Sequence, residues 1–100
     1  MPYGLGMTTT VYKTEDSIIG TSGGRIRLFT ASWLSDGTAR ALVLRNGTDE
    51  NGTIWVTAAG TASVNTTVNF GREGIVFDSG CFFDFTASMV SAVFTYRVEL

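Results

Sequence analysis

The stretch Arg25-Ile-Arg-Leu-Phe-Thr-Ala-Ser-Trp-Leu34 alternates between two sets of side chains at every second position. Successive side chains of a strand point to opposite faces of a sheet, so this period of two predicts a β-strand. Asp36-Gly37 follows, and an Asp-Gly pair between two such runs predicts a hairpin turn. Residues 38–45 are then the return strand, and because both of its faces are apolar in the middle, we expect an interior position.

The rest of the chain continues this pattern in the C-terminal direction. Clusters of Gly, Asn, Asp and Ser separate short apolar runs, and the clearest alternation is at the end of the chain. Regular turns every eight to twelve residues are typical of sandwiches and small barrels. We therefore predict an all-β fold: a single antiparallel β-sandwich, jelly-roll-like or Ig-like, of about seven or eight strands. The further predicted strands are residues 53–58, 63–70, 81–86 and 90–98.

The amino-acid composition argues against several classes of function, among them nucleic-acid binding, metal binding and catalysis. The chain has 100 residues, 44% of them hydrophobic and 16% charged, with a net charge of −2. This size suits one domain, and the charge gives no attraction to nucleic acid or acidic membranes. There is no histidine, and Cys81 is the single cysteine. We therefore expect no catalytic site, no cofactor and no metal, and we interpret Cys81 as a small buried hydrophobic residue.

The first 24 residues differ from the remainder, so we divide the chain into an extended N-terminal arm, residues 1–24, and a sandwich domain, residues 25–100. Residues 8–14 have weak strand character but no neighbouring hairpin partner, and Ser22-Gly23-Gly24 resembles a hinge. An extended segment can add itself to the sheet edge of another chain. We expect the arm to order on an adjacent subunit. Its apolar side chains would fill pockets there: Tyr3, Leu5, Met7, Val11 and Tyr12.

Two tryptophans are the other candidate binding residues. Trp33 and Trp55 could anchor a protein interface, pack in the core or form a sugar-stacking face. Asp78 and Asp84 are a carboxylate pair in an aromatic setting, as glycoside cleavage requires. Asp78 lies in an Asp-Ser-Gly turn and Asp84 alternates away from the apolar face of its strand. Turn and surface roles are therefore the favoured interpretation of both carboxylates.

Residues 25–97 resemble small virion proteins of tailed bacteriophages. The order and spacing of several segments carry this resemblance: Arg25–Trp33, then Ala41-Leu-Val-Leu-Arg-Asn-Gly-Thr48, Gly52-Thr-Ile54, Val68-Asn-Phe-Gly71, Gly74-Ile-Val-Phe77, Gly80 and Tyr96-Arg97.

The resemblance implies a β-sandwich that decorates, or cements, a phage capsid by binding its subunits. It also implies the major capsid protein as a partner, a homo-oligomer that could be a trimer, and a place in the virion after synthesis in the host cytoplasm. Neither a signal peptide nor an apolar run of about 18 residues is visible, so we expect no membrane partner. A neck, tail or fibre protein, and a carbohydrate-binding β-sandwich module, remain the alternatives.

Overall fold

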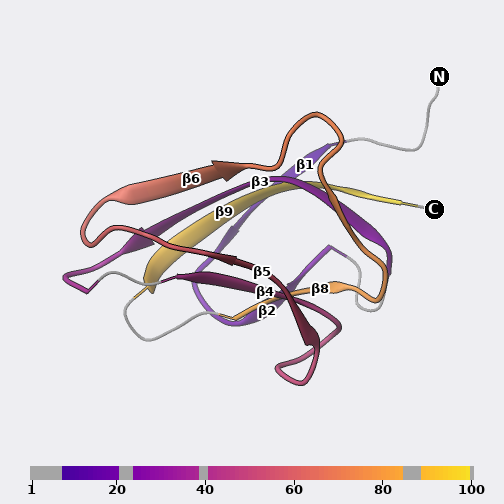
Figure 1. Cartoon of the computed structure of the whole chain (residues 1–100), viewed down its shortest axis with the longest axis horizontal. Coiled ribbons are helices and arrows are strands. Elements are labelled where there is room, and N and C mark those ends of the chain that lie inside the picture. Colours follow the sequence, from indigo (N-terminus) through magenta and orange to yellow (C-terminus); the bar gives the residue numbers. More distant parts are fainter. Residues whose placement is uncertain (1–7, 21–23, 39–40, 85–88, 100) are drawn as a thin grey trace.

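The computed structural model describes residues 8–20, 24–38, 41–84 and 89–99, and these residues form two antiparallel sheets packed face to face (Figure 1). The prediction of an all-β sandwich is therefore confirmed. The strands are β1 (Thr9–Lys13), β2 (Ser17–Ile19), β3 (Ile26–Ser35), β4 (Leu42–Asn46), β5 (Thr53–Ala58), β6 (Asn65–Asn69), β7 (Ile75–Phe77), β8 (Cys81–Phe83) and β9 (Met89–Val98).

The strand order is that of a jelly roll. One sheet, called sheet A here, has the order β1-β9-β3-β6, with β7 continuing beside β3; the other, sheet B, has the order β2-β8-β4-β5. β6 and β7 both pair with β3, so they act as one interrupted strand. The chain then forms one long antiparallel ribbon, β1–β4 against β5–β9, wrapped into two sheets. Gly74 permits the interruption: its φ is +67°, and an added Cβ would lie 2.6 Å from the Leu28 carbonyl oxygen.

A β-bulge in β3 changes which of its side chains face the core. Leu28 pairs with Tyr96 and Thr30 with Thr95, so Phe29 is an extra residue on its strand. Strict alternation had placed Trp33 on the face opposite Leu28. That prediction is wrong, because the bulge shifts the alternation by one residue. Four side chains of β3 are consequently buried on the same inner face: Ile26, Leu28, Ala31 and Trp33.

The predicted hairpin at Asp36-Gly37 is also wrong. β3 belongs to sheet A and β4 to sheet B, so the two strands do not pair. The Asp36 side chain accepts a hydrogen bond from the Thr38 amide at 3.2 Å, and the backbone carbonyl of Asp36 accepts one from the Ser63 amide at 2.8 Å. These bonds make the turn a connection between sheets. The interior position of the following strand is confirmed, since β4 lies between β8 and β5.

The N-terminal segment is part of the sandwich from Thr9 onward. β1 pairs with β9 over its full length, and β2 pairs with β8. Ile19 is completely buried in the core, and Val11 packs against it. An arm that stands apart from the sandwich over residues 1–24 does not agree with these contacts. The partner of residues 9–13 is the C-terminal strand of the same chain, which sequence proximity could not reveal. Residues 1–7, and Ser22 and Gly23 of the predicted hinge Ser22-Gly23-Gly24, lie outside the described residues.

The core lies between the sheets and is aromatic at its centre. Phe83 from sheet B meets Phe94 from sheet A edge to face, with ring centroids 4.9 Å apart. Cys81 is completely buried beside them, which confirms its interpretation as a hydrophobic residue. Burial raises the pKa of the Cys81 thiol to about 12, because the thiolate would lose its hydration.

Cys81 is therefore expected to be unreactive toward a thiol reagent such as Ellman's reagent at pH 8 in the folded protein. The reactive thiolate is both inaccessible and scarce at that pH. Denaturation in urea should release one thiol per chain. Rapid labelling without denaturant would contradict the burial of this side chain.

A small ionic cluster holds the end of the chain against β3. Arg27 donates to Glu99 Oε1 through Nε and Nη2, at 3.2 and 3.1 Å, and Arg97 donates to Glu99 Oε2 at 2.9 Å. The Arg27 guanidinium also reaches the Glu73 carbonyl oxygen at 2.6 Å. The hydrogen bonds from Arg27 and Arg97 lower the pKa of the Glu99 carboxyl, and the bond from Arg27 has the largest effect.

Glu99→Gln is expected to lower the free energy of unfolding by about 1 kcal/mol at pH 7. A lowered pKa in the folded state means that the carboxylate stabilises the fold above its ordinary titration range. This contribution is lost as the pH falls below that range, so the difference between variant and wild type should shrink toward about pH 3. Urea denaturation at several pH values measures it. Glu73→Gln is the matched control and should change little, since Arg27 uses the backbone of residue 73.

Candidate interaction surface

The predicted partner-binding residues separate into three groups in the structure. Trp33 is only 1% exposed, so its prediction as a surface anchor is wrong: the bulge in β3 turns it into the core. Trp55 and Tyr12 are 45% and 64% exposed, whereas Val11 packs against the core. Trp55 and Tyr12 lie on different strands, β5 and β1, at edges of different sheets. The remaining candidates, Tyr3, Leu5 and Met7, lie outside the described residues.

Trp55 owes its position to a second bulge. Leu44 pairs with Val56 and Arg45 with Ile54, so Trp55 has no partner residue across the β4–β5 ladder. Its ring tilts at 44° toward the buried ring of Phe77, with 6.3 Å between centroids. Phe77 belongs to sheet A, so Trp55 bridges the two sheets at their margin. One side of the indole is packed and the other faces solvent.

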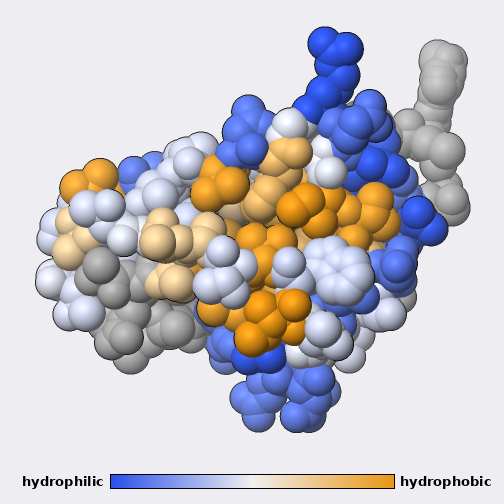
Figure 2. Space-filling model, viewed as in Figure 1, coloured by the Kyte–Doolittle hydropathy of each residue, from blue (hydrophilic) through white to orange (hydrophobic). Residues whose placement is uncertain are grey.

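Trp55 is part of a larger apolar surface, which we call the seam. β5 is the last strand of sheet B, and the interrupted strand β6–β7 is the last strand of sheet A. Inward-facing residues of these strands pair with core residues, but among the described residues no further strand covers them from outside. Figure 2 shows hydrophobic side chains gathered between β5 and β6 on this side. The seam consists of Trp55, Val56, Ala58, Val68, Phe70 and Ile75. Ile54 pairs with Arg45 and therefore lies on the outer face of sheet B.

The strands that border the seam lack the usual protection of sheet edges. Natural edges are blunted by charged residues, proline or very short strands. β1 carries Lys13, and β2 has only three residues. In contrast, β5 (Thr-Ile-Trp-Val-Thr-Ala) and β6 (Asn-Thr-Thr-Val-Asn) contain no charge and no proline. On one side of each of these two strands, the backbone donors and acceptors pair with no other strand that the structure describes.

The outer face of sheet A has a different character, because its polar side chains bond to one another. The hydroxyls of Thr10 and Thr95 lie 3.3 Å apart, Asn65 Nδ2 donates to Ser32 Oγ at 2.9 Å, and Thr67 Oγ1 lies 3.2 Å from the same Ser32 oxygen. A face of this kind is well suited to water. The seam is therefore the better candidate for contact with another molecule.

The carboxylates considered for catalysis are held in separate ion pairs. Asp84 Oδ2 accepts from Arg45 Nε at 3.3 Å, and Asp78 lies 3.9 Å from Arg25. Asp78 begins the turn from β7 in sheet A to β8 in sheet B, as its Asp-Ser-Gly sequence predicts. Within the described ranges, no group of three or more His, Cys, Asp or Glu side chains could hold a metal ion. Those ranges also contain no helix with the length and hydropathy to cross a membrane.

Trp55 is the only seam residue that was also a predicted partner-binding residue. Val56 and Val68 have the pattern of ordinary alternating strand residues, and no local signal shows whether a strand lies at the edge of a sheet. The one signal in the sequence that could have indicated this surface is the lack of charged residues at 53–58 and 65–69.

Comparison with known proteins returned no match among protein-family models, curated proteins or solved structures.

Proposed function

We propose that the chain is a structural protein of a tailed-bacteriophage virion, with capsid decoration as its role. The observation that carries the proposal is the jelly-roll strand order, an architecture used in viral capsid proteins. The resemblance of residues 25–97 to small virion proteins supports the same role. The neck, tail or fibre remains the alternative position in the particle.

The proposed mechanism is adhesion of a rigid domain to repeated subunits. The core is closed by aromatic packing between the sheets, and the seam offers an apolar surface with a half-exposed tryptophan. Tryptophan is one of the residues that carry most binding energy at interfaces. On a symmetric lattice, many modest contacts act together, so each one can be weak. Self-association is part of this proposal, and a trimer is the form that the resemblance implies.

Mass spectrometry of purified particles tests the proposal directly. A capsid decoration protein should be present in hundreds of copies per particle, and a neck or tail protein in a handful. Purified protein should also bind to particles that lack it, and the bound particles should resist heating better than the bare ones. Particles that contain no copy of the chain would refute a virion role.

Carbohydrate binding is the second candidate, since jelly rolls also occur in lectins and one face of Trp55 is exposed. A tryptophan pair cannot form the platform, because Trp33 lies in the core. A sugar stacked on Trp55 should shift the tryptophan fluorescence of the wild-type protein. It should not shift the fluorescence of the Trp55→Phe variant, in which Trp33 is the remaining tryptophan. The absence of any shift across a panel of oligosaccharides would remove this candidate.

A further inference from the structure

The sequence Asn-Gly-Thr occurs twice at the connection between β4 and β5, at residues 46–48 and 51–53. An asparagine that precedes glycine is chemically labile, because glycine has no side chain to shield its amide nitrogen. That nitrogen loses its proton and bonds to the side-chain carbonyl carbon of the asparagine, whose side-chain nitrogen leaves as ammonia. Water then opens the resulting succinimide ring to aspartate or isoaspartate. Since the two copies share one local sequence, a difference in their reactivity must come from the fold.

The first copy is held by sheet B. Asn46 is the last residue of β4, and it pairs with β8 on one side and with β5 on the other. Its side-chain oxygen accepts a hydrogen bond from the Ser79 amide at 2.9 Å. The amide of Gly47, which is the attacking group, donates to the Gly80 carbonyl oxygen at 3.0 Å. Both reacting groups are thus fixed, and freeing them requires part of the sheet to open.

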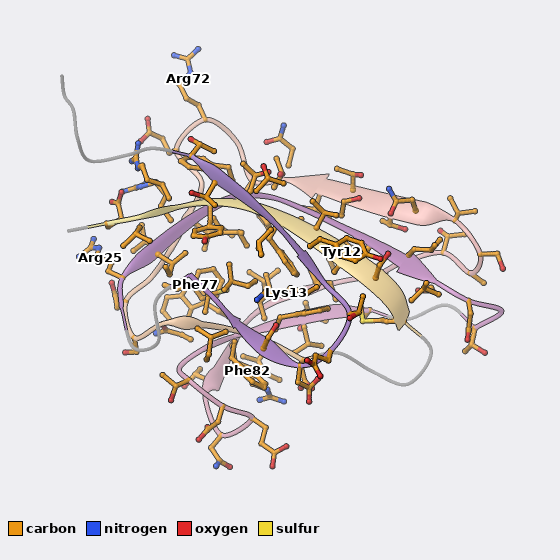
Figure 3. All side chains as sticks on the ribbon, turned by 180° about the vertical axis from the view of Figure 1, so that it is seen from behind. Tyr12, Lys13, Arg25, Arg72, Phe77 and Phe82 are labelled. Atoms are coloured by element: carbon orange, nitrogen blue, oxygen red, sulfur yellow. The ribbon has the colours of Figure 1, made fainter. Side chains whose placement is uncertain are left out.

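The second copy lies in an exposed turn. Asn51 is exposed and outside every strand, and Figure 3 shows this loop projecting below the labelled Phe82 with its side chains directed away from the sandwich. Within the described ranges, no group hydrogen-bonds to the Asn51 side chain. The Asn51 amide donates to Asp49 Oδ1 at 2.8 Å, and the Gly52 amide donates to the Asp49 carbonyl oxygen at 3.1 Å. These bonds belong to a single turn, and an exposed turn opens at little cost in free energy.

We propose that Asn51 is a site of spontaneous modification, at which the folded protein converts asparagine to aspartate and isoaspartate while Asn46 stays intact. The reaction requires no enzyme and no reactant other than water. It does not depend on the proposed virion role, because it needs only the folded chain in solution.

The modification changes the charge and the backbone of one loop. Each conversion adds a negative charge next to Asp49 and Glu50. Isoaspartate also adds one carbon atom to the main chain immediately before Gly52, whose carbonyl oxygen accepts from Arg45 Nη1 at 3.1 Å. Arg45 has a second bond, from its Nε to Asp84 at 3.3 Å, that does not involve the loop. The modified chain is therefore expected to stay folded with an altered loop.

Incubation of the full chain at pH 8, followed by peptide mapping with mass spectrometry, tests the proposal. Deamidation should be at least about tenfold faster at Asn51 than at Asn46, because opening sheet B costs part of the stability of the fold. In urea the two rates should become similar, since the local sequences are the same. Isoelectric focusing should show a more acidic form accumulating. Isoaspartate can also form at Asp36-Gly37, so the peptide map locates each modified residue.

Asn51→Gln is the matched control, because glutamine forms the corresponding six-membered ring far more slowly. The variant should have the wild-type circular dichroism spectrum and should lack the early acidic form. Three outcomes would each overturn the proposal. They are equal rates at the two asparagines of the folded protein, a faster reaction at Asn46, and no reaction at Asn51 over the time in which the chain reacts in urea.

Discussion

Trp33→Ala is expected to lower the free energy of unfolding by about 3–5 kcal/mol, the usual loss for a large aromatic side chain in a core. Trp33 is completely enclosed between the sheets, and its neighbours in β3 and β9 are themselves buried. Removing the indole leaves a cavity that two hydrogen-bonded sheets cannot close. Because the free energy of unfolding of a small domain is only about 5–15 kcal/mol in total, the variant should be only marginally stable. Urea denaturation followed by circular dichroism measures the effect.

Trp55→Ala is the matched control for this experiment. The same side chain is removed from the seam, where one side of the ring already faces solvent. The expected loss is about 1 kcal/mol or less, chiefly from the contact with Phe77. Equal destabilisation by the two substitutions would contradict the bulge in β3 that turns Trp33 inward.

Deletion of residues 1–20 is expected to abolish cooperative folding. The deletion removes β1 and β2, one strand from each sheet, and takes the fully buried Ile19 out of the core. It also leaves β9 as an unpaired edge along residues 92–96, the stretch that β1 covers. The lost packing and pairing are comparable with the whole stability of a domain of this size. Thermal unfolding followed by circular dichroism should show no transition, and the protein should aggregate.

Deletion of residues 1–7 is the control, because it keeps both strands complete. This shorter form should unfold cooperatively near the temperature of the full chain. If residues 21–100 alone fold with the same transition, then β1 and β2 do not belong to the cooperative unit, and the first 20 residues act as the separable arm that the sequence suggested.

The local features of this protein could be predicted from its residues alone. Alternation and turn residues predicted the strands at 53–58 and 90–98 closely, and the two apolar faces of residues 42–44 predicted the interior position of β4. The buried state of Cys81 followed from its apolar neighbours. These features depend on residues within a few positions of each other, so the period of a strand and the chemistry of a turn are sufficient to find them.

Which strands pair, and which faces stay exposed, depends on contacts between distant parts of the folded chain. A single extra residue at Phe29 moved Trp33 from the predicted surface to the core, and the residues that pair with β1 lie 79 to 87 positions away along the chain. The seam exists because β5 and β6–β7 end their sheets on the same side of the sandwich. Strand order is set by contacts between distant segments, which no local pattern encodes, and therefore the exposed surface of a β-sandwich emerges only when both sheets are assembled.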